Sequence, residues 1–171
     1  MLTLSLLRHA KSSTDEDTML DADRPLARRG EKAAPAIGGY MRLHDLKPDL
    51  VLVSTARRTR DTWALIRPHL DCTPEELVED GLYLASPAAL LARLKRLPAA
   101  ARHVLVVGHN PGLHALALDL VATGRREDIT AMGRKFPTCA LAVISFTQSS
   151  WKDLHPALGA LRLYITPAKL G

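Results

Sequence analysis

Short apolar runs recur along the chain, separated by polar loops and by longer stretches with a helical pattern. Three runs are nearly uninterrupted by polar residues, which is typical of strands buried on both faces of a sheet: residues 2–7, 49–53 and 103–107. A weaker run predicts a strand at 78–84. Two further runs, at 138–147 and 160–166, predict paired strands joined by a loop around 151–159.

Helices are expected between these strands. Apolar residues recur at helical spacing in four stretches: residues 30–43, 55–67, 88–97 and 113–122. Ser86 and Pro87 predict the start of one helix, as N-cap and first helical residue, and Asn110 with Pro111 predicts another in the same way. We expect a polar loop at 11–25, and a polar, basic connection at 124–137.

This alternation of strand and helix predicts an α/β fold. We expect three layers, α/β/α, with a mostly parallel central sheet covered by helices on both faces. The last two strands are able to pair antiparallel at one edge. The 171 residues contain no repeat or linker and have the length of one domain, so we expect a single domain over residues 1–171.

Composition favours an ordinary globular protein with an aliphatic core. Hydrophobic residues make up 47% of the chain, but only 4% of residues are aromatic. The net charge of +5 is spread along the chain without interleaved aromatic residues that could stack on bases, so we expect no nucleic-acid partner. An arginine excess suits an anionic ligand, although codon bias explains most of it.

The sequence shows no sign of export, membrane insertion or structural metal. The apolar stretch at 113–122 is interrupted by His114 and Asp119 and is too short to span a bilayer. Cys72 and Cys139 form no CxxC motif and have no histidine at ligand spacing. We therefore expect a soluble, cytoplasmic protein with reduced thiols.

Two histidines and two arginines follow predicted strands. Arg8 and His9 end the first strand, Arg58 comes shortly after the second, and His109 follows the strand at 103–107. The carboxyl ends of parallel strands lie at one edge of a sheet, where ligands bind in such folds. We therefore expect these four side chains to face the same edge.

Three blocks in this order resemble the histidine phosphatase superfamily, also called the phosphoglycerate mutase-like fold. They are Leu-Arg-His-Ala at 7–10, Ser-Thr-Ala-Arg-Arg at 54–58 with Thr62, and Gly-His-Asn-Pro at 108–111. Ala10 replaces the usual glycine and Thr55 a common proline. Neither departure alters a reacting group.

Within that superfamily, the chain resembles the bacterial SixA-type phosphohistidine phosphatases. The resemblance lies in its short length and in two segments, Asp-Arg-Pro-Leu at 23–26 and Gly-Leu-Tyr-Leu-Ala-Ser at 81–86. It implies a phosphatase that needs neither a metal ion nor a cofactor.

The resemblance also implies a role for each residue of the three blocks. His9 is expected to be the nucleophile, attacking phosphorus to form a transient phosphohistidine. Arg8, Arg58 and His109 are expected to bind the phosphate oxygens, with His109 as an imidazolium. Block spacing favours Arg58 over its neighbour Arg57.

Three further residues are candidates for the site. Arg24 reaches the pocket if the loop after the first strand folds back over the edge, and a surface charge is the alternative. Glu79 and Asp80 lie where larger superfamily members place a proton donor, or they are solvated residues beside a strand. SixA-type enzymes are understood to lack such an acid, because imidazole leaves more easily than an alkoxide.

We therefore favour a phosphatase that removes phosphate from phosphohistidine on a protein, such as a histidine-phosphotransfer protein. The chain is too short for the helical lid of larger relatives, so its pocket is expected to be open. One alternative is a phosphomonoesterase for small esters such as sugar phosphates or nucleotides. Another is a non-catalytic module that binds phospho-ligands, although such a module needs no nucleophile. We expect a monomer without a membrane partner.

Overall fold

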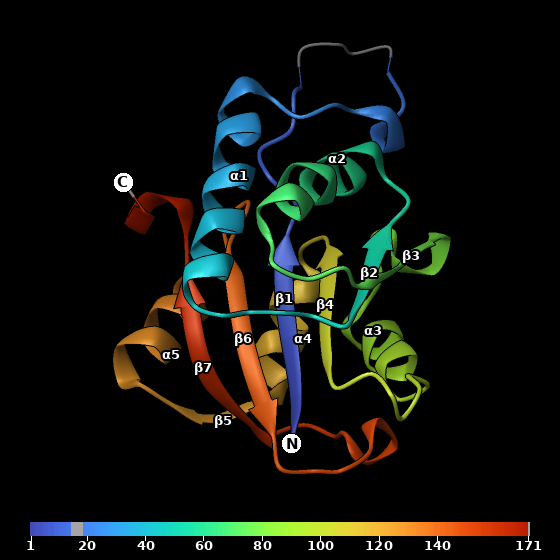
Figure 1. The fold of residues 1–171 in the computed structure, drawn as a ribbon, viewed down its shortest axis with the longest axis vertical. Coiled ribbons are helices and arrows are strands. Elements are labelled where there is room, and N and C mark those ends of the chain that lie inside the picture. Colours follow the sequence, from blue (N-terminus) through green and yellow to red (C-terminus); the bar gives the residue numbers. More distant parts are fainter. Residues whose placement is uncertain (15–18, 171) are drawn as a thin grey trace.

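A seven-stranded sheet forms the centre of the protein in a computed structural model that describes residues 1–14 and 19–170. The strand order is β3-β2-β4-β1-β6-β7-β5 (Figure 1). The strands are β1 (Leu2–Arg8), β2 (Leu50–Ser54), β3 (Glu75–Glu79), β4 (His103–Gly108), β5 (Val121–Gly124), β6 (Leu141–Phe146) and β7 (Gly159–Ile165). All neighbours pair in parallel except β6, which is antiparallel to both β1 and β7.

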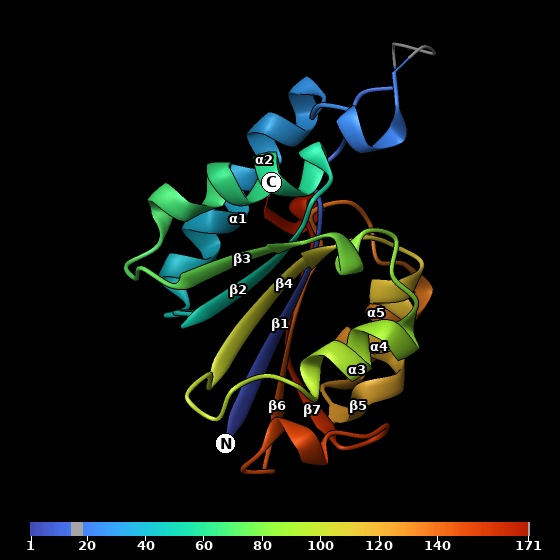
Figure 2. The ribbon, with the colours of Figure 1, turned by 90° about the vertical axis from the view of Figure 1, so that its right-hand side faces the viewer.

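Five α-helices cover the two faces of this sheet, as the side view in Figure 2 shows. One face carries α1 (Arg28–Leu43) and α2 (Arg57–Ile66), and the other carries α3 (Pro87–Leu94), α4 (Gly112–Leu120) and α5 (Arg126–Arg134). The expected three-layer α/β/α fold is confirmed. No helix in the described part of the chain is long and apolar enough to cross a membrane.

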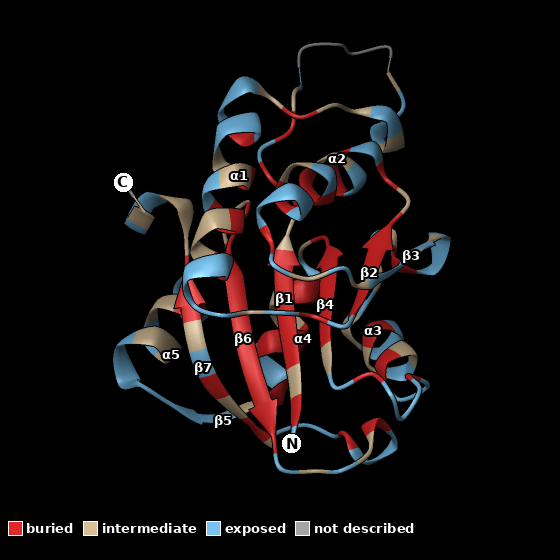
Figure 3. Ribbon diagram, viewed as in Figure 1, coloured by how far each residue is buried: buried red, intermediate tan, exposed pale blue. Residues whose placement is uncertain are grey.

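Strand β1 shows how the apolar pattern builds two cores. Leu2, Leu4 and Leu6 are fully buried among the residues of α3 and α4. Leu7 points to the opposite face and packs in the second cluster with α1 and α2. Because both faces are covered, the strand reads as a nearly continuous apolar run, and Figure 3 shows the central strands as buried.

The order of strands at one side differs from the expectation. β6 and β7 do pair antiparallel, but they do not form the edge, because β5 lies beyond β7. β5 is four residues long and mostly exposed, so its sequence contains no apolar run from which a strand could be predicted. The connection expected at 124–137 contains the helix α5.

Two local predictions also need correction. The strand expected at 78–84 lies at Glu75–Glu79, because an exposed edge strand does not require an apolar run. α4 begins at Gly112, and Asn110 is not its cap. Instead the Asn110 side-chain amide donates to the Phe136 carbonyl at 2.8 Å. The predicted cap at Ser86 is confirmed, since its hydroxyl accepts from the Ala89 amide at 3.1 Å.

Candidate active site

The carboxyl ends of three adjacent strands bring the predicted residues together. β2, β4 and β1 are neighbours, and Arg8 on β1 pairs in register with Gly108 on β4. His9 and His109 continue from these two positions. Their ring centroids lie 5.5 Å apart with the planes inclined at 54°. The two imidazoles therefore share one site at the sheet edge, as the topology predicted.

His9 is held as a neutral ring. Its Nδ1 lies 2.8 Å from the Ala10 carbonyl oxygen, and because a carbonyl only accepts, Nδ1 carries the proton. Nε2 forms no hydrogen bond with any described residue and keeps its lone pair. Burial, reinforced by Arg58, His109 and Arg8, lowers the pKa of His9 to about 3, although the Ala10 carbonyl opposes the shift.

The backbone that holds this ring is itself fixed by Thr62. The Thr62 hydroxyl accepts from the Ala10 amide at 2.9 Å and donates to the Arg58 carbonyl at 2.6 Å. The Cys139 amide donates to the His9 carbonyl at 2.9 Å. A single hydroxyl on α2 thus connects the segment that carries His9 to the turn that carries Arg58.

Arg58 is buried and fixed at several atoms. Nη1 donates to the Asp21 carbonyl at 2.8 Å, and Nη2 donates to the Asp21 carboxylate at 3.1 Å and to His109 Nδ1 at 3.3 Å. Its neighbour Arg57 is exposed and pairs with Asp61 on the helix surface at 3.3 Å. The structure therefore places Arg58, and not Arg57, beside the two histidines.

His109 is a neutral ring in this arrangement, and the imidazolium expected for the phosphate site stays a prediction. Its Nδ1 accepts from Arg58, and its Nε2 donates to the Ser54 hydroxyl at 2.7 Å. Burial and the charge of Arg58 lower the pKa of His109 to about 4, even though Asp21 opposes the shift. A proton on Nδ1 would face the N–H of Arg58.

Arg8 also lies near the histidine pair, since its charge acts on the pKa of both rings. Its Nη1 donates to the Phe136 carbonyl at 3.2 Å. Burial, with Arg58 nearby, lowers its pKa, although a guanidinium remains charged at neutral pH. Nε of Arg8 and Nε of Arg58 are buried without an acceptor in the described part of the chain. Both donors are therefore left without a partner among the described residues.

The sequence analysis did not identify Asp21 and Tyr83 as site residues. The Asp21 carboxylate accepts from the Tyr83 hydroxyl, from Arg58 and from Arg24. These contacts, Tyr83 first, lower the pKa of Asp21 to about 2. The edge of the Tyr83 ring meets His109 at 5.4 Å between centroids. Tyr83 lies in one SixA-like segment and Asp21 lies two residues before the other, which was the available signal.

Arg24 reaches this network through Asp21. Its Nε lies 3.0 Å from the Asp21 carboxylate, and its Nη1 donates to the Ser12 hydroxyl at 2.9 Å. The described residues Asp21 and Arg24 of the loop after β1 therefore do lie against the site. Arg24 touches neither imidazole through a hydrogen bond and supports Arg58 through a shared partner.

The two candidate acids, Glu79 and Asp80, differ in their contacts and their exposure to solvent. Glu79 pairs with Ser54 in the sheet register, but its carboxylate binds Arg93 with contacts of 2.7 and 2.9 Å. Those hydrogen bonds lower the pKa of Glu79, so the carboxylate is ionised at neutral pH and is a poor proton donor. Asp80 is exposed at the start of a short 3-10 turn.

Comparisons with known proteins find a family model and several relatives that match this chain. A family model for the histidine phosphatase superfamily (branch 1) matches residues 4–81. An uncharacterized protein from Mycobacterium tuberculosis is 36% identical over 157 residues, which are 91% of this chain and 96% of the relative.

Solved structures extend the similarity to nearly the whole chain. A protein from Nakamurella multipartitia, provisionally assigned as the phosphohistidine phosphatase SixA, is 34% identical with a TM-score of 0.81, over 97% of this chain and 96% of that one. Its counterpart from Agrobacterium tumefaciens is 26% identical with a TM-score of 0.79, over 97% and 98%. The protein histidine phosphatase SixA complexed with tungstate is 21% identical with a TM-score of 0.79, over 99% and 100%, and shows the shared fold alone.

Proposed function

Because this chain belongs to the histidine phosphatase superfamily, with SixA-type relatives, and is a phosphatase, we propose that it removes the phosphoryl group from phosphohistidine on a protein. In this proposal His9 is the nucleophile, and Arg8, Arg58 and His109 bind the phosphoryl oxygens. Arg24, through Asp21, supports Arg58.

The observation that carries the proposal is the state of His9. The Ala10 carbonyl holds Nδ1–H, and a pKa of about 3 keeps the ring unprotonated at neutral pH. The Nε2 lone pair attacks phosphorus while the bond from phosphorus to the substrate imidazole breaks, and that imidazole takes the electron pair and then a proton from solvent water. Water next attacks the phosphohistidine at His9, releases inorganic phosphate and restores the neutral ring.

Charge in the pocket suits this reaction. The transition state places negative charge on three equatorial oxygens, and fixed donors stabilise it. Arg8 and Arg58 offer buried N–H groups without an acceptor among the described residues. A phosphoryl dianion beside His109 favours protonation of that ring, because opposite charges raise the pKa of an imidazole. In this proposal His109 therefore becomes an imidazolium when substrate binds.

The leaving group decides between substrate classes. An alkoxide needs a proton donor, whereas imidazole leaves as a much weaker base. Glu79 is ionised in its pair with Arg93, and the contacts of Asp21 lower its pKa to about 2. Neither of these two carboxyls supplies a proton near neutral pH, and Asp80 is exposed with no side-chain hydrogen bond to a described site residue. This supports phosphohistidine over a small phosphate ester.

A substrate comparison tests the proposal. The purified protein is assayed with free Nε-phosphohistidine and with glycerol 2-phosphate, and we expect a kcat/KM at least about 100-fold higher for the phosphohistidine. Alkaline quenching of a labelled reaction should trap phosphate on wild-type protein and none on the His9→Ala variant. A preference for the ester would favour the phosphomonoesterase, and binding without turnover would favour a non-catalytic module.

A further inference from the structure

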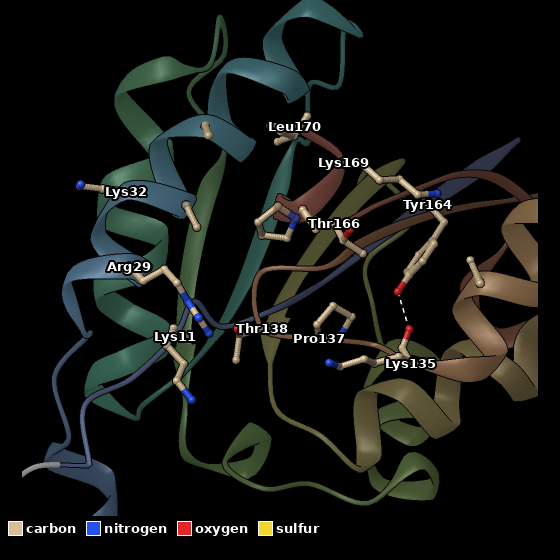
Figure 4. Close-up of a pocket in the computed structure, with 15 residues that line it drawn as sticks. Lys11, Arg29, Lys32, Lys135, Pro137, Thr138, Tyr164, Thr166, Lys169 and Leu170 are labelled. Carbon is tan, nitrogen blue, oxygen red and sulfur yellow. Dashed lines mark hydrogen bonds between the residues drawn. The ribbon is translucent and has the colours of Figure 1, made fainter.

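A groove with a volume of about 840 Å³ lies outside the histidine pocket, among α1, the segment 135–138 and the C-terminal segment Pro167–Leu170 (Figure 4). We call it the basic groove. Basic side chains contribute five of its lining residues: Lys11, Arg29, Lys32, Lys135 and Lys169.

The charges of the basic groove are uncompensated. All five basic residues are exposed, no acidic residue lines the groove, and none of the five forms an ion pair with a carboxylate in the described ranges. Elsewhere exposed cations such as Arg57 and Arg67 do find acidic partners. A concave surface lined by one sign of charge attracts the opposite sign.

The interior of the groove is apolar. Apart from the hydroxyl residues Thr138 and Thr166, it is lined by small or aliphatic residues: Ala33, Ala36, Ala131, Pro137, Pro167, Ala168 and Leu170. Tyr164 also lines it, but its ring is buried and its hydroxyl donates to the Lys135 carbonyl, so it offers no free face for a nucleotide base. An apolar floor with a basic rim complements an amphipathic helix that carries acidic residues beside its apolar stripe.

The same segments that line the groove also support the catalytic pocket. Lys11 follows His9 by two residues. The Phe136 carbonyl, between the groove residues Lys135 and Pro137, accepts from Arg8. The Cys139 amide, directly after Thr138, donates to the His9 carbonyl. A partner seated in the groove therefore contacts segments that also position Arg8 and His9.

We propose that the basic groove binds an acidic amphipathic helix of the phosphorylated protein substrate, close to its phosphohistidine. This inference rests on the proposed function and adds the surface that selects the protein. The histidine pocket carries out the chemistry, and the groove raises the rate of productive encounter through electrostatic steering.

Two matched phosphohistidine peptides test the groove. One is an amphipathic helical peptide with glutamates beside its apolar stripe, and the other carries glutamine at each of those positions. We expect wild-type kcat/KM to be about 10-fold higher for the acidic peptide at low salt, and the difference to shrink as salt rises. In the Lys32→Glu, Lys135→Glu double variant this preference should be lost.

The control variant is Lys95→Glu with Lys152→Glu, which changes the net charge equally at two exposed lysines outside the groove. We expect it to retain most of the preference. Free phosphohistidine is the third substrate, and unchanged turnover of it shows that both variants are folded.

Each failure has its own signature. If wild type hydrolyses free phosphohistidine but treats the two peptides alike, the groove proposal is wrong and the proposed function stands. If ATP binds wild type and the groove variant loses that binding while the peptides remain equal, the groove belongs to a nucleotide. If no phosphohistidine compound is hydrolysed, the proposed function fails, and the groove proposal fails with it.

Discussion

The two ends of β4 carry similar histidines in different surroundings. At the amino end, His103 Nε2 lies 2.8 Å from the Ser5 hydroxyl, and at the carboxyl end, His109 Nε2 lies 2.7 Å from the Ser54 hydroxyl. Burial lowers the pKa of both rings. Only His109 lies beside Arg58, whereas the charge acting on His103 is that of Asp49.

This difference shows what turns a buried histidine into part of a phosphate site. A histidine–serine hydrogen bond satisfies a ring nitrogen at either end of the strand and by itself indicates no chemistry. At the carboxyl end, the guanidinium groups of Arg8 and Arg58 add buried positive charge, and His9 adds a free lone pair. The predictions below test the contrast between these two ends.

The largest expected effect comes from removing the nucleophile. His9→Ala should lower kcat on phosphohistidine by at least about 10⁴-fold, because no other lone pair replaces Nε2. His103→Ala is the matched change at the other end, and its kcat should stay within about twofold. Steady-state kinetics of the two variants make the comparison, and equal losses would show that neither histidine is the nucleophile.

The second-largest effect is expected when one guanidinium group is replaced by an ammonium group. Arg58→Lys should reduce kcat/KM about 10²–10³-fold, because lysine lacks the planar fork that binds Asp21, His109 and the phosphoryl oxygens together. Arg57→Lys alters an exposed surface pair and should stay within about twofold. A similar loss in both variants would mean that α2 has been disturbed as a whole.

The pH dependence of stability gives a smaller effect. The folded pKa values of about 3 for His9 and about 4 for His109 lie below the ordinary value near 6.5. At pH values between the folded pKa and 6.5, each of these rings binds a proton in the unfolded chain and stays unprotonated in the folded protein. The contribution of these two rings to the free energy of unfolding should therefore be constant above pH 6.5. It should fall as the pH drops toward 4.

Urea unfolding at pH 7 and pH 5 measures this fall, which we expect to be roughly 2 kcal/mol for each ring. The His9→Gln, His109→Gln variant removes both titrating groups and should lose less stability between the two pH values. An identical fall in wild type and variant would refute the lowered pKa values.

The smallest expected effect is that of metal removal. Two guanidinium groups and a protonated His109 supply the positive charge of the bound state, so EDTA should change kcat by less than about twofold. Turnover is measured after exhaustive dialysis against the chelator, with magnesium added back as the control. Loss of activity that magnesium restores would contradict the metal-independent pocket.

Much of the site could be predicted because its residues stand next to the strongest elements of the sequence. His9 and His109 follow strands that are apolar on both faces, so their places at the sheet edge follow from the strand ends. Glu79 could not be judged in the same way. Its partner Arg93 lies on a helix 14 residues away, and no sequence pattern in either segment predicts that the two side chains pair.

The sequence by itself determined the alternation of strands and helices, the aliphatic two-sided core and the order of the three motif blocks, because these depend on residues close together in the chain. The tertiary structure alone decided that β5 closes one edge, that Ala10 selects the proton position of His9, and that Asp21 holds Arg58. These outcomes depend on which polar groups meet after folding. A polar side chain in a loop looks the same in the sequence whether it contacts solvent or completes a buried site.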